Sequence, residues 1–251
     1  MRTIRINPAY EHLRTFIGQL PDRMDSDGVY IYGGRRNLIK RFEAPDGTPL
    51  NVKRYKIPSF PSNICYSTGW RLPKGERAFT YPSILLEKGI ETPEAVAYIE
   101  ERVMGILRRS WFVSIHCLYS HRLYEMGDAG AAQYEPMARA LAAYCAHMHD
   151  QGVLHLDFSP GNVLWEKDGD TYRFSIVDIN RMRFGRVSME DGCRSFARLW
   201  GAKRFLQLLV REYARLRLFD PQEAEDVLMK ERRRFWKHYQ KKREMEFPLE
   251  L

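Results

Sequence analysis

The 251-residue sequence is poor in cysteine and has no long apolar run, and each absence excludes a class of protein. The four cysteines lack the paired spacing of a zinc or redox site, so we expect reduced thiols in a cytosolic compartment. No stretch approaches the roughly 18 apolar residues that a membrane-spanning helix needs. The first residues also lack the apolar core of a signal peptide. We therefore expect a soluble, cytoplasmic protein. The cysteines are Cys65, Cys117, Cys145 and Cys193.

The composition is that of a folded protein with an excess of positive charge. A hydrophobic fraction of 44% argues against a disordered chain. The length suits one large core or two modest ones. The formal net charge of +8 favours an anionic partner, which could be nucleic acid, a phosphorylated substrate or an acidic membrane surface. Charge alone does not choose among these partners.

The most informative stretch runs from His155 to Asn162 and is followed by Asp178. Asp157 lies two residues after His155 and five before Asn162, which is the spacing of a kinase catalytic loop. In such a loop the Asp accepts the proton of the attacking hydroxyl, and the Asn holds a magnesium ion. A second acidic residue has to reach the metals that bridge the nucleotide phosphates. The pattern therefore assigns His155 and Asp157 to catalysis, and Asn162 and Asp178 to metal binding.

The residues between Asn162 and Asp178 are expected to form a β-hairpin. Residues 163–165 and 172–177 are apolar and β-branched, as strands are, and residues 167–170 contain the Asp-Gly pair of a tight turn. Folding about that turn brings Asn162 and Asp178 to the same open end. The alternative, that these polar residues are ordinary surface turns, explains neither the spacing nor the hairpin.

Two glycines in the N-terminal part suggest a loop that covers phosphates. Gly33 and Gly34 lie between expected strands at residues 29–32 and 38–42. Glycines let backbone N–H groups approach phosphate oxygens closely. An ordinary hairpin turn would have the same sequence, so the alternative stays open.

Lys53 lies in the next expected strand, at residues 50–55, where a kinase places the lysine that contacts nucleotide phosphates. Arg54 and Lys56 compete for this role. Side chains alternate along a strand, so Lys53 shares a face with Tyr55 and not with Arg54. The alternative is a solvated lysine at a sheet edge.

A helix is expected from Lys74 or Glu76 to Lys88, with Gly89 as its C-terminal cap. Its position after the Lys53 strand makes it the candidate for the helix whose Glu pairs with that lysine. We choose Glu76 over Glu87, which immediately precedes the cap region.

The remaining elements follow from apolar periodicity and from turn residues. We expect strands at 95–100 and 110–116 with a turn at 104–109 between them, an irregular segment at 57–73, and helices at 134–149, 191–218 and from 221 onward. Residues 7–20 are expected to form either a short amphipathic helix or a strand with a helix, and to break at Pro21 and Asp22. His147 and His149 lack metal-ligand spacing and are expected to be structural.

Several of these motifs together resemble the lipopolysaccharide core kinase family, which includes the Kdo kinases and the heptose kinases. The resemblance lies in His155-Leu156-Asp157, in Asn162 and in the Asp-x-Asn-Arg form of the metal motif at residues 178–181. Residues 77–93, with their Gly-Ile-x-Thr-Pro ending, and the glycine turn at 32–37 also resemble this family. The resemblance covers roughly residues 25 to 200.

The resemblance implies an α+β, protein-kinase-like fold with two lobes, an N-lobe at 1–116 with an antiparallel sheet and one helix, and a mainly helical C-lobe at 117–251. It implies ATP with magnesium as donor, and a Kdo or heptose hydroxyl on the lipid A-linked core as acceptor. By position, Asp157 is the base, Asn162 and Asp178 bind metal, and Lys53 contacts phosphate. The sequence departs from protein kinases in Leu156 and in the absence of an Ala-Pro-Glu motif.

Two other functions remain open. One is a phosphotransferase of the same fold that acts on another small molecule or on protein. The other is an inactive pseudokinase that serves as a scaffold, although the four residues Lys53, Asp157, Asn162 and Asp178 argue against it.

The basic C-terminal helix, with Phe, Trp and Tyr among its cations, could lie on the anionic face of an inner membrane. It could equally be a solvated helix with its aromatics packed into the lobe. We expect no binding of nucleic acid.

Overall fold

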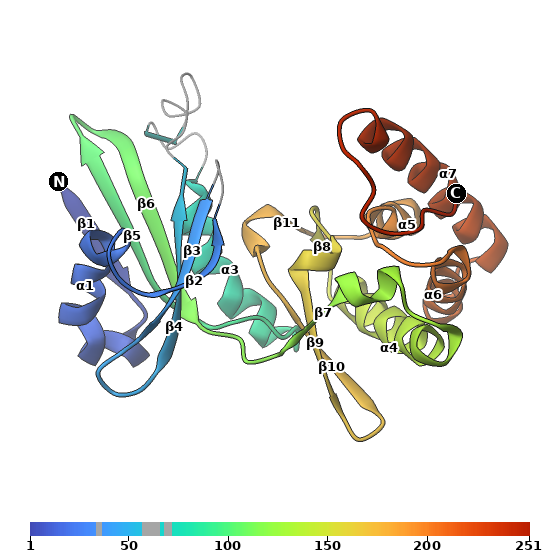
Figure 1. The fold of residues 1–251 in the computed structure, drawn as a ribbon, viewed down its shortest axis with the longest axis horizontal. Helices are drawn as coiled ribbons and strands as arrows, with labels where there is room; N and C mark the ends of the chain where they lie inside the picture. Colours follow the sequence, from blue (N-terminus) through green and yellow to red (C-terminus); the bar gives the residue numbers. More distant parts are fainter. Residues whose placement is uncertain (34–36, 57–65, 68–71) are drawn as a thin grey trace. The chain divides into compact units, whose positions relative to one another are not determined.

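The computed structural model describes residues 1–33, 37–56, 66–67 and 72–251, and these form two compact units (Figure 1). The first unit comprises Met1–Glu87 and Thr92–Leu118, and the second comprises Lys88–Glu91 and Tyr119–Leu251. Residues 88–91 belong with the second unit because their backbone carbonyls bond to it. The Lys88 carbonyl contacts His147 Nε2 at 3.0 Å, and the Glu91 carbonyl accepts from the Ile176 N–H at 3.0 Å.

The first unit is built on a six-stranded antiparallel sheet with the order β1-β5-β6-β4-β3-β2. Its elements are β1 (Arg2–Ile6), η1 (Pro8–Leu13), α1 (Arg14–Arg23), β2 (Val29–Gly33), β3 (Asn37–Glu43), β4 (Pro49–Tyr55), α3 (Lys74–Glu87), β5 (Ala95–Val103) and β6 (Ile106–Ile115). The strands expected around the glycine pair, the Lys53 strand and the α3 helix are confirmed.

Helix α1 packs on one face of this sheet and forms a hydrophobic core with it. From α1 and the residue after it, Ile17, Leu20 and Met24 are fully buried, against Val52 of β4 and Val113 of β6, among others. The helix runs past Pro21 to Arg23, so the expected break at Pro21 is wrong. Burial of this apolar stripe outweighs the hydrogen bond that a proline removes.

Helix α3 packs against β5 and β6 on the opposite face, where side chains alternate with those of the core. A side chain at Gly75 would meet the rings of Tyr98 and Tyr55, at 2.6 and 3.2 Å from its Cβ, so the first turn of α3 lies directly on these strands. Among the described residues of this unit, α1 lies within and just beyond the segment at 7–20 where a helical segment was expected, and α3 is the helix expected after the Lys53 strand.

The β5–β6 hairpin is tighter than expected. Its turn consists of Met104 and Gly105, and β6 begins at Ile106, so the turn predicted at 104–109 was too long. Residues 106–109 pair with β5, where backbone hydrogen bonding overrides the weak strand signal of two arginines.

The second unit is mainly helical, with a three-stranded sheet β10-β9-β7 and a two-stranded sheet β11-β8. Its elements are β7 (His121–Arg122), η2 (Leu123–Gly127), α4 (Ala131–Asp150), β8 (Val153–His155), η3 (Pro160–Asn162), β9 (Val163–Asp168), β10 (Thr171–Ile176), η4 (Ile179–Arg181), β11 (Met182–Phe184), α5 (Met189–Phe196), α6 (Lys203–Leu216) and α7 (Pro221–Gln240). The predicted hairpin and the helices at 134–149 and from 221 are confirmed.

The single helix expected at 191–218 is wrong, because the chain leaves the helical path between α5 and α6. Gly201 has φ of +130°, which favours glycine. Two buried side chains of α7 donate hydrogen bonds to backbone carbonyls between α5 and α6. Trp236 Nε1 donates to Ala197 O at 2.9 Å, and Arg232 Nη1 donates to Leu199 O at 2.6 Å. These tertiary hydrogen bonds satisfy groups that a continuous helix would have satisfied itself.

In the part of the chain that the structure describes, no helix combines the length and the apolar character of a membrane span. The segment predicted to be irregular at 57–73 lies largely outside the described residues.

A buried histidine joins α4 to α6 and makes stability depend on pH. His149 is 1% exposed, and its Nδ1 lies 2.8 Å from the hydroxyl of Tyr213, which also accepts from Arg217 at 2.6 Å. Burial and the positive charge of Arg217 lower the pKa of His149 from 6.5 to about 3, against a smaller opposing effect of Asp191.

We predict that lowering the pH from 8 to 5 reduces the free energy of unfolding by about 2 kcal/mol through His149. The imidazole of the unfolded chain takes up a proton near pH 6.5, whereas the buried imidazole of the folded chain does not. The free energy of unfolding therefore has its full value above that pH and declines below it. Urea denaturation at several pH values measures it. In His149→Gln the difference between pH 8 and pH 5 should shrink by about 2 kcal/mol; an unchanged difference would contradict the assignment.

Candidate active site

The second unit brings the predicted loop and metal residues together through backbone pairing. The N–H of Leu156 donates to Arg181 O at 2.9 Å, next to the pairing of β8 with β11. At the open end of the β9–β10 hairpin, the N–H of Val177 donates to Asn162 O at 3.0 Å. These pairings join residues 155–162 to residues 176–182 in one backbone frame. This frame holds Asp157, Asn162 and Asp178 close together, as the hairpin argument predicted.

His155 connects the two sides of this frame. It is 1% exposed, its Nδ1 accepts from the N–H of Asp157 at 3.1 Å, and its Nε2 lies 3.1 Å from Val177 O. Since Nδ1 accepts, Nε2 carries the proton and donates, which defines a neutral imidazole. Burial lowers the pKa of His155, in agreement with this state. The side chain can act on the reaction only through the backbone that it positions, and its predicted catalytic role stays a prediction.

Asn162 and Asp178 present oxygen atoms suited to magnesium. Asn162 Nδ2 donates to Asp157 O at 2.9 Å, which leaves Oδ1 as the possible ligand atom. Asp178 has a left-handed backbone, with φ of 57°, and its Oδ1 accepts from the amide of the buried Asn180. Within the described residues no cluster of three or more His, Cys, Asp and Glu gathers for a metal. Magnesium needs none, because it is commonly held by one or two protein oxygens together with phosphates and water.

Asp157 lies between two arginines. Its Oδ1 accepts from Arg198 Nη1, and its Oδ2 lies 3.5 Å from Arg181 Nη1. The carboxylate side chain is 27% exposed, whereas the two arginine side chains are 39% and 51% exposed, respectively. The predicted base therefore sits at a partly open, positively charged rim.

Sequence reasoning missed three residues of this site as functional groups. Asn180 and Arg181 belong to the Asp-x-Asn-Arg motif, so their presence next to Asp178 was a usable signal. Arg198 lies 41 residues from Asp157, after the end of α5, and no local pattern marked it.

In the first unit, Lys53 is buried at 8% exposure on β4, which has a neighbour strand on each side. The alternative of a solvated lysine at an edge is therefore wrong. The Lys53 ammonium lies 5.3 Å from the ring centre of Tyr55, on the sheet face predicted for both. Arg54 pairs with Asp25 at 2.8 Å.

The glycine turn is described in part. Gly33 ends β2, and a side chain there would meet the ring of Tyr30, at 2.7 Å from its Cβ. Gly34 lies outside the described residues. Phosphate contact by either glycine stays a prediction.

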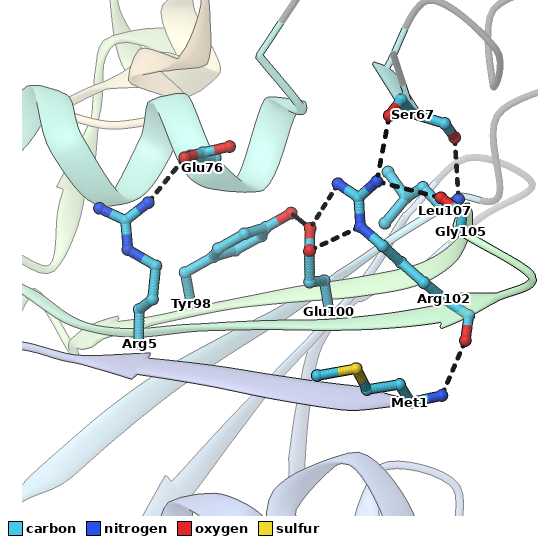
Figure 2. Close-up of polar contacts among 9 residues, drawn as sticks. All are labelled: Met1, Arg5, Ser67, Glu76, Tyr98, Glu100, Arg102, Gly105 and Leu107. Carbon is cyan, nitrogen blue, oxygen red and sulfur yellow. Dashed lines mark hydrogen bonds and ion pairs between the residues drawn. The ribbon is translucent and has the colours of Figure 1, made fainter. Parts of the chain in front are cut away.

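Glu76 lies on the first turn of α3, and its carboxylate accepts from Arg5 of β1 at 2.6 Å (Figure 2). On the same side of β5, Glu100 is held by the hydroxyl of Tyr98 at 2.8 Å and by Arg102 at 2.7 Å. The pairing of Glu76 with Lys53 stays a prediction.

A solved structure titled "WaaP in complex with acyl carrier protein" is similar to this chain, with 19% identity, a TM-score of 0.60, and coverage of 94% of this chain and 99% of that one. The Rio2 kinase from Chaetomium thermophilum, in its ADP/Mg2+-phosphoaspartate complex, has 18% identity and a TM-score of 0.48, over 93% of this chain and 78% of that one. No curated protein matches the sequence. The similarity to the first of these structures shows the predicted protein-kinase-like fold.

The family follows from a second comparison. The model of the lipopolysaccharide kinase (Kdo/WaaP) family matches residues 79–216, more than half of the 251 residues. The chain belongs to this family and is an ATP-dependent phosphotransferase with an alcohol group as acceptor. The resemblance inferred from the motifs is confirmed.

We predict that His155→Leu lowers stability by about 2 to 4 kcal/mol, because it leaves the Asp157 N–H and the Val177 carbonyl unpaired in a buried site. It should also lower kcat more than it changes the KM for ATP, since the loop that it positions carries Asp157, the predicted base. Thermal unfolding and steady-state kinetics measure the two effects.

His147→Leu is the matched control. Its imidazole is exposed and bonds only to Lys88 O among the described contacts, so the loss should stay below about 1 kcal/mol. Equal stability losses in the two variants would rule out the bridging role of His155.

Proposed function

We propose that this kinase transfers the γ-phosphoryl group of ATP to a hydroxyl of a Kdo or heptose sugar in the inner core of lipopolysaccharide. The observation that supports it most directly is the common frame of Asp157, Asn162 and Asp178, together with membership of the family. The new bond joins the sugar oxygen to phosphorus, the bond to the β–γ bridging oxygen breaks, and ADP leaves with that electron pair. Asp157 receives the proton of the hydroxyl.

Magnesium would be held by Asn162 Oδ1 and the Asp178 carboxylate, and would neutralise charge on the phosphates. Lys53 would contact the phosphates, and the turn at Gly33 and Gly34 would cover them with backbone N–H groups. Glu76 would help to orient Lys53. His155 would position the loop.

We predict that Asp157→Asn lowers kcat for transfer to lipopolysaccharide core acceptors by about 10²- to 10⁴-fold. The amide keeps the shape of the side chain but cannot accept the proton, so affinity for MgATP should change little. Radiolabelled phosphate transfer and a nucleotide-binding titration measure the two. Asp170→Asn, in the exposed turn of the β9–β10 hairpin, is the control and should behave as wild type.

The same assay separates the alternatives. Binding of MgATP without transfer to any Kdo- or heptose-containing core would move the acceptor to another small molecule or to protein. Absence of MgATP binding in the wild type would favour the scaffold.

The outer face of α7 supports contact with an anionic membrane surface. Five cations at helical spacing share this face: Lys230, Arg233, Arg234, Lys237 and Lys241. All are exposed, and no ion pair among the described residues neutralises them. Trp236, in contrast, is 2% exposed and bonded to Ala197. The contact we propose is therefore electrostatic, made by cations without inserted aromatics, on the membrane that carries the glycolipid acceptor.

Replacing Lys230, Arg233, Arg234 and Lys237 by Gln should weaken binding to vesicles rich in anionic lipid by about 1 kcal/mol for each charge removed. Co-sedimentation at low and physiological salt measures this, and binding should fall as salt rises. The control replaces four scattered exposed arginines, Arg108, Arg109, Arg139 and Arg186, by Gln. Equal losses in both variants would contradict a role specific to α7.

A further inference from the structure

The two arginines at Asp157 have no assigned role in phosphoryl transfer. Each approaches a different oxygen of the carboxylate, Arg198 at Oδ1 and Arg181 at Oδ2. An ionised carboxylate accepts through two oxygens, which have about four lone-pair sites between them. An acceptor hydroxyl that approaches Asp157 therefore has to share a carboxylate oxygen with a guanidinium or displace that guanidinium.

The local charge favours an anionic acceptor. Two guanidinium groups and one carboxylate leave a net charge of +1 at this rim. A neutral sugar that displaced a guanidinium would leave it without an anionic partner, and such a loss is costly where groups are partly shielded from water. A sugar that carries a carboxylate or a phosphate replaces the partner that it removes. The planar guanidinium is suited to both of these anions.

Arg198 is held in place independently of Asp157. Its guanidinium lies 5.3 Å from the ring centre of Phe235 on α7, a cation–π contact. The carbonyls of its neighbours Ala197 and Leu199 accept from Trp236 and Arg232, both buried. Arg198 would thus remain at the rim if its bond to Asp157 were given up.

We propose that Arg198, assisted by Arg181, binds an anionic group of the acceptor sugar next to the hydroxyl that Asp157 orients. The guanidinium exchanges Asp157 for a carboxylate or phosphate of the acceptor, which frees an oxygen of Asp157 for the hydroxyl. Arg198 is then a specificity residue for an acidic acceptor. This inference rests on the proposed function, because it concerns the acceptor of the same reaction.

The test compares wild type with Arg198→Ala and Arg198→Lys on three acceptors: a deacylated Kdo-bearing core, the same core with its sugar carboxylates methylated, and the core with its phosphates removed. We expect Arg198→Ala to lower kcat/KM for the unmodified core by about 10- to 100-fold, the range for a hydrogen bond to a charged group. The KM for ATP should stay within about twofold of wild type, and Arg198→Lys should recover part of the loss.

The modified acceptors identify the anion. If the carboxylate is bound, methylation should lower wild-type kcat/KM by a similar factor and have little effect on Arg198→Ala, because the two changes remove one interaction. If a phosphate is bound, the dephosphorylated core should show this pattern instead. Equal sensitivity of wild type and Arg198→Ala to both modifications, or a rise in the KM for ATP instead of an effect on the acceptor, would overturn the proposal.

Arg194→Ala is the control, since this exposed arginine of α5 lies 3.8 Å from Glu231 and outside the rim. Thermal unfolding of each variant excludes a general loss of structure. Calorimetric binding of free Kdo and its methyl ester gives a readout without turnover. If Kdo binds through its carboxylate, Arg198→Ala abolishes this binding and no phosphoryl transfer is seen, the proposed function alone is contradicted. If transfer occurs without any preference for an anionic acceptor, this inference alone is contradicted.

Discussion

The geometry of the catalytic loop depends on one neutral imidazole. His155 accepts from the backbone of Asp157 on one side and donates to the carbonyl before Asp178 on the other. Both bonds are possible only while the ring is uncharged, and burial enforces that state. The relative positions of Asp157 and Asp178, the predicted base and the predicted metal ligand, thus depend on the hydrogen bonds of one buried side chain.

A second set of contacts ties the site to the C-terminal helix. Arg232 and Trp236 on the inner face of α7 bond to the carbonyls on either side of Arg198, and Phe235 lies against its guanidinium. Of the aromatic residues of α7, Trp236 is therefore held in the interior and Phe235 is held against Arg198. Its remaining cations face outward, which explains why one helix can support the site and present a charged surface at once.

Local physics accounts for what could be predicted. The Asp-Gly turn and its apolar flanks determine the β9–β10 hairpin, and alternation along β4 places Lys53 and Tyr55 on one face. Prediction failed where distant groups decided the outcome. The helix expected at 191–218 is interrupted by bonds from α7, and α1 continues through Pro21 because its buried stripe is held by the sheet.

The sequence by itself determined that Asp157, Asn162 and Asp178 come together, because they lie within one hairpin of each other and short-range geometry is sufficient to join them. Only the tertiary structure decided what surrounds Asp157, the predicted base. Arg198 reaches Asp157 across 41 residues of sequence, and its position depends on the packing of α7, which begins more than twenty residues farther along. Contacts of that range are set by burial of whole helices and leave no periodic signal near the residues that they join.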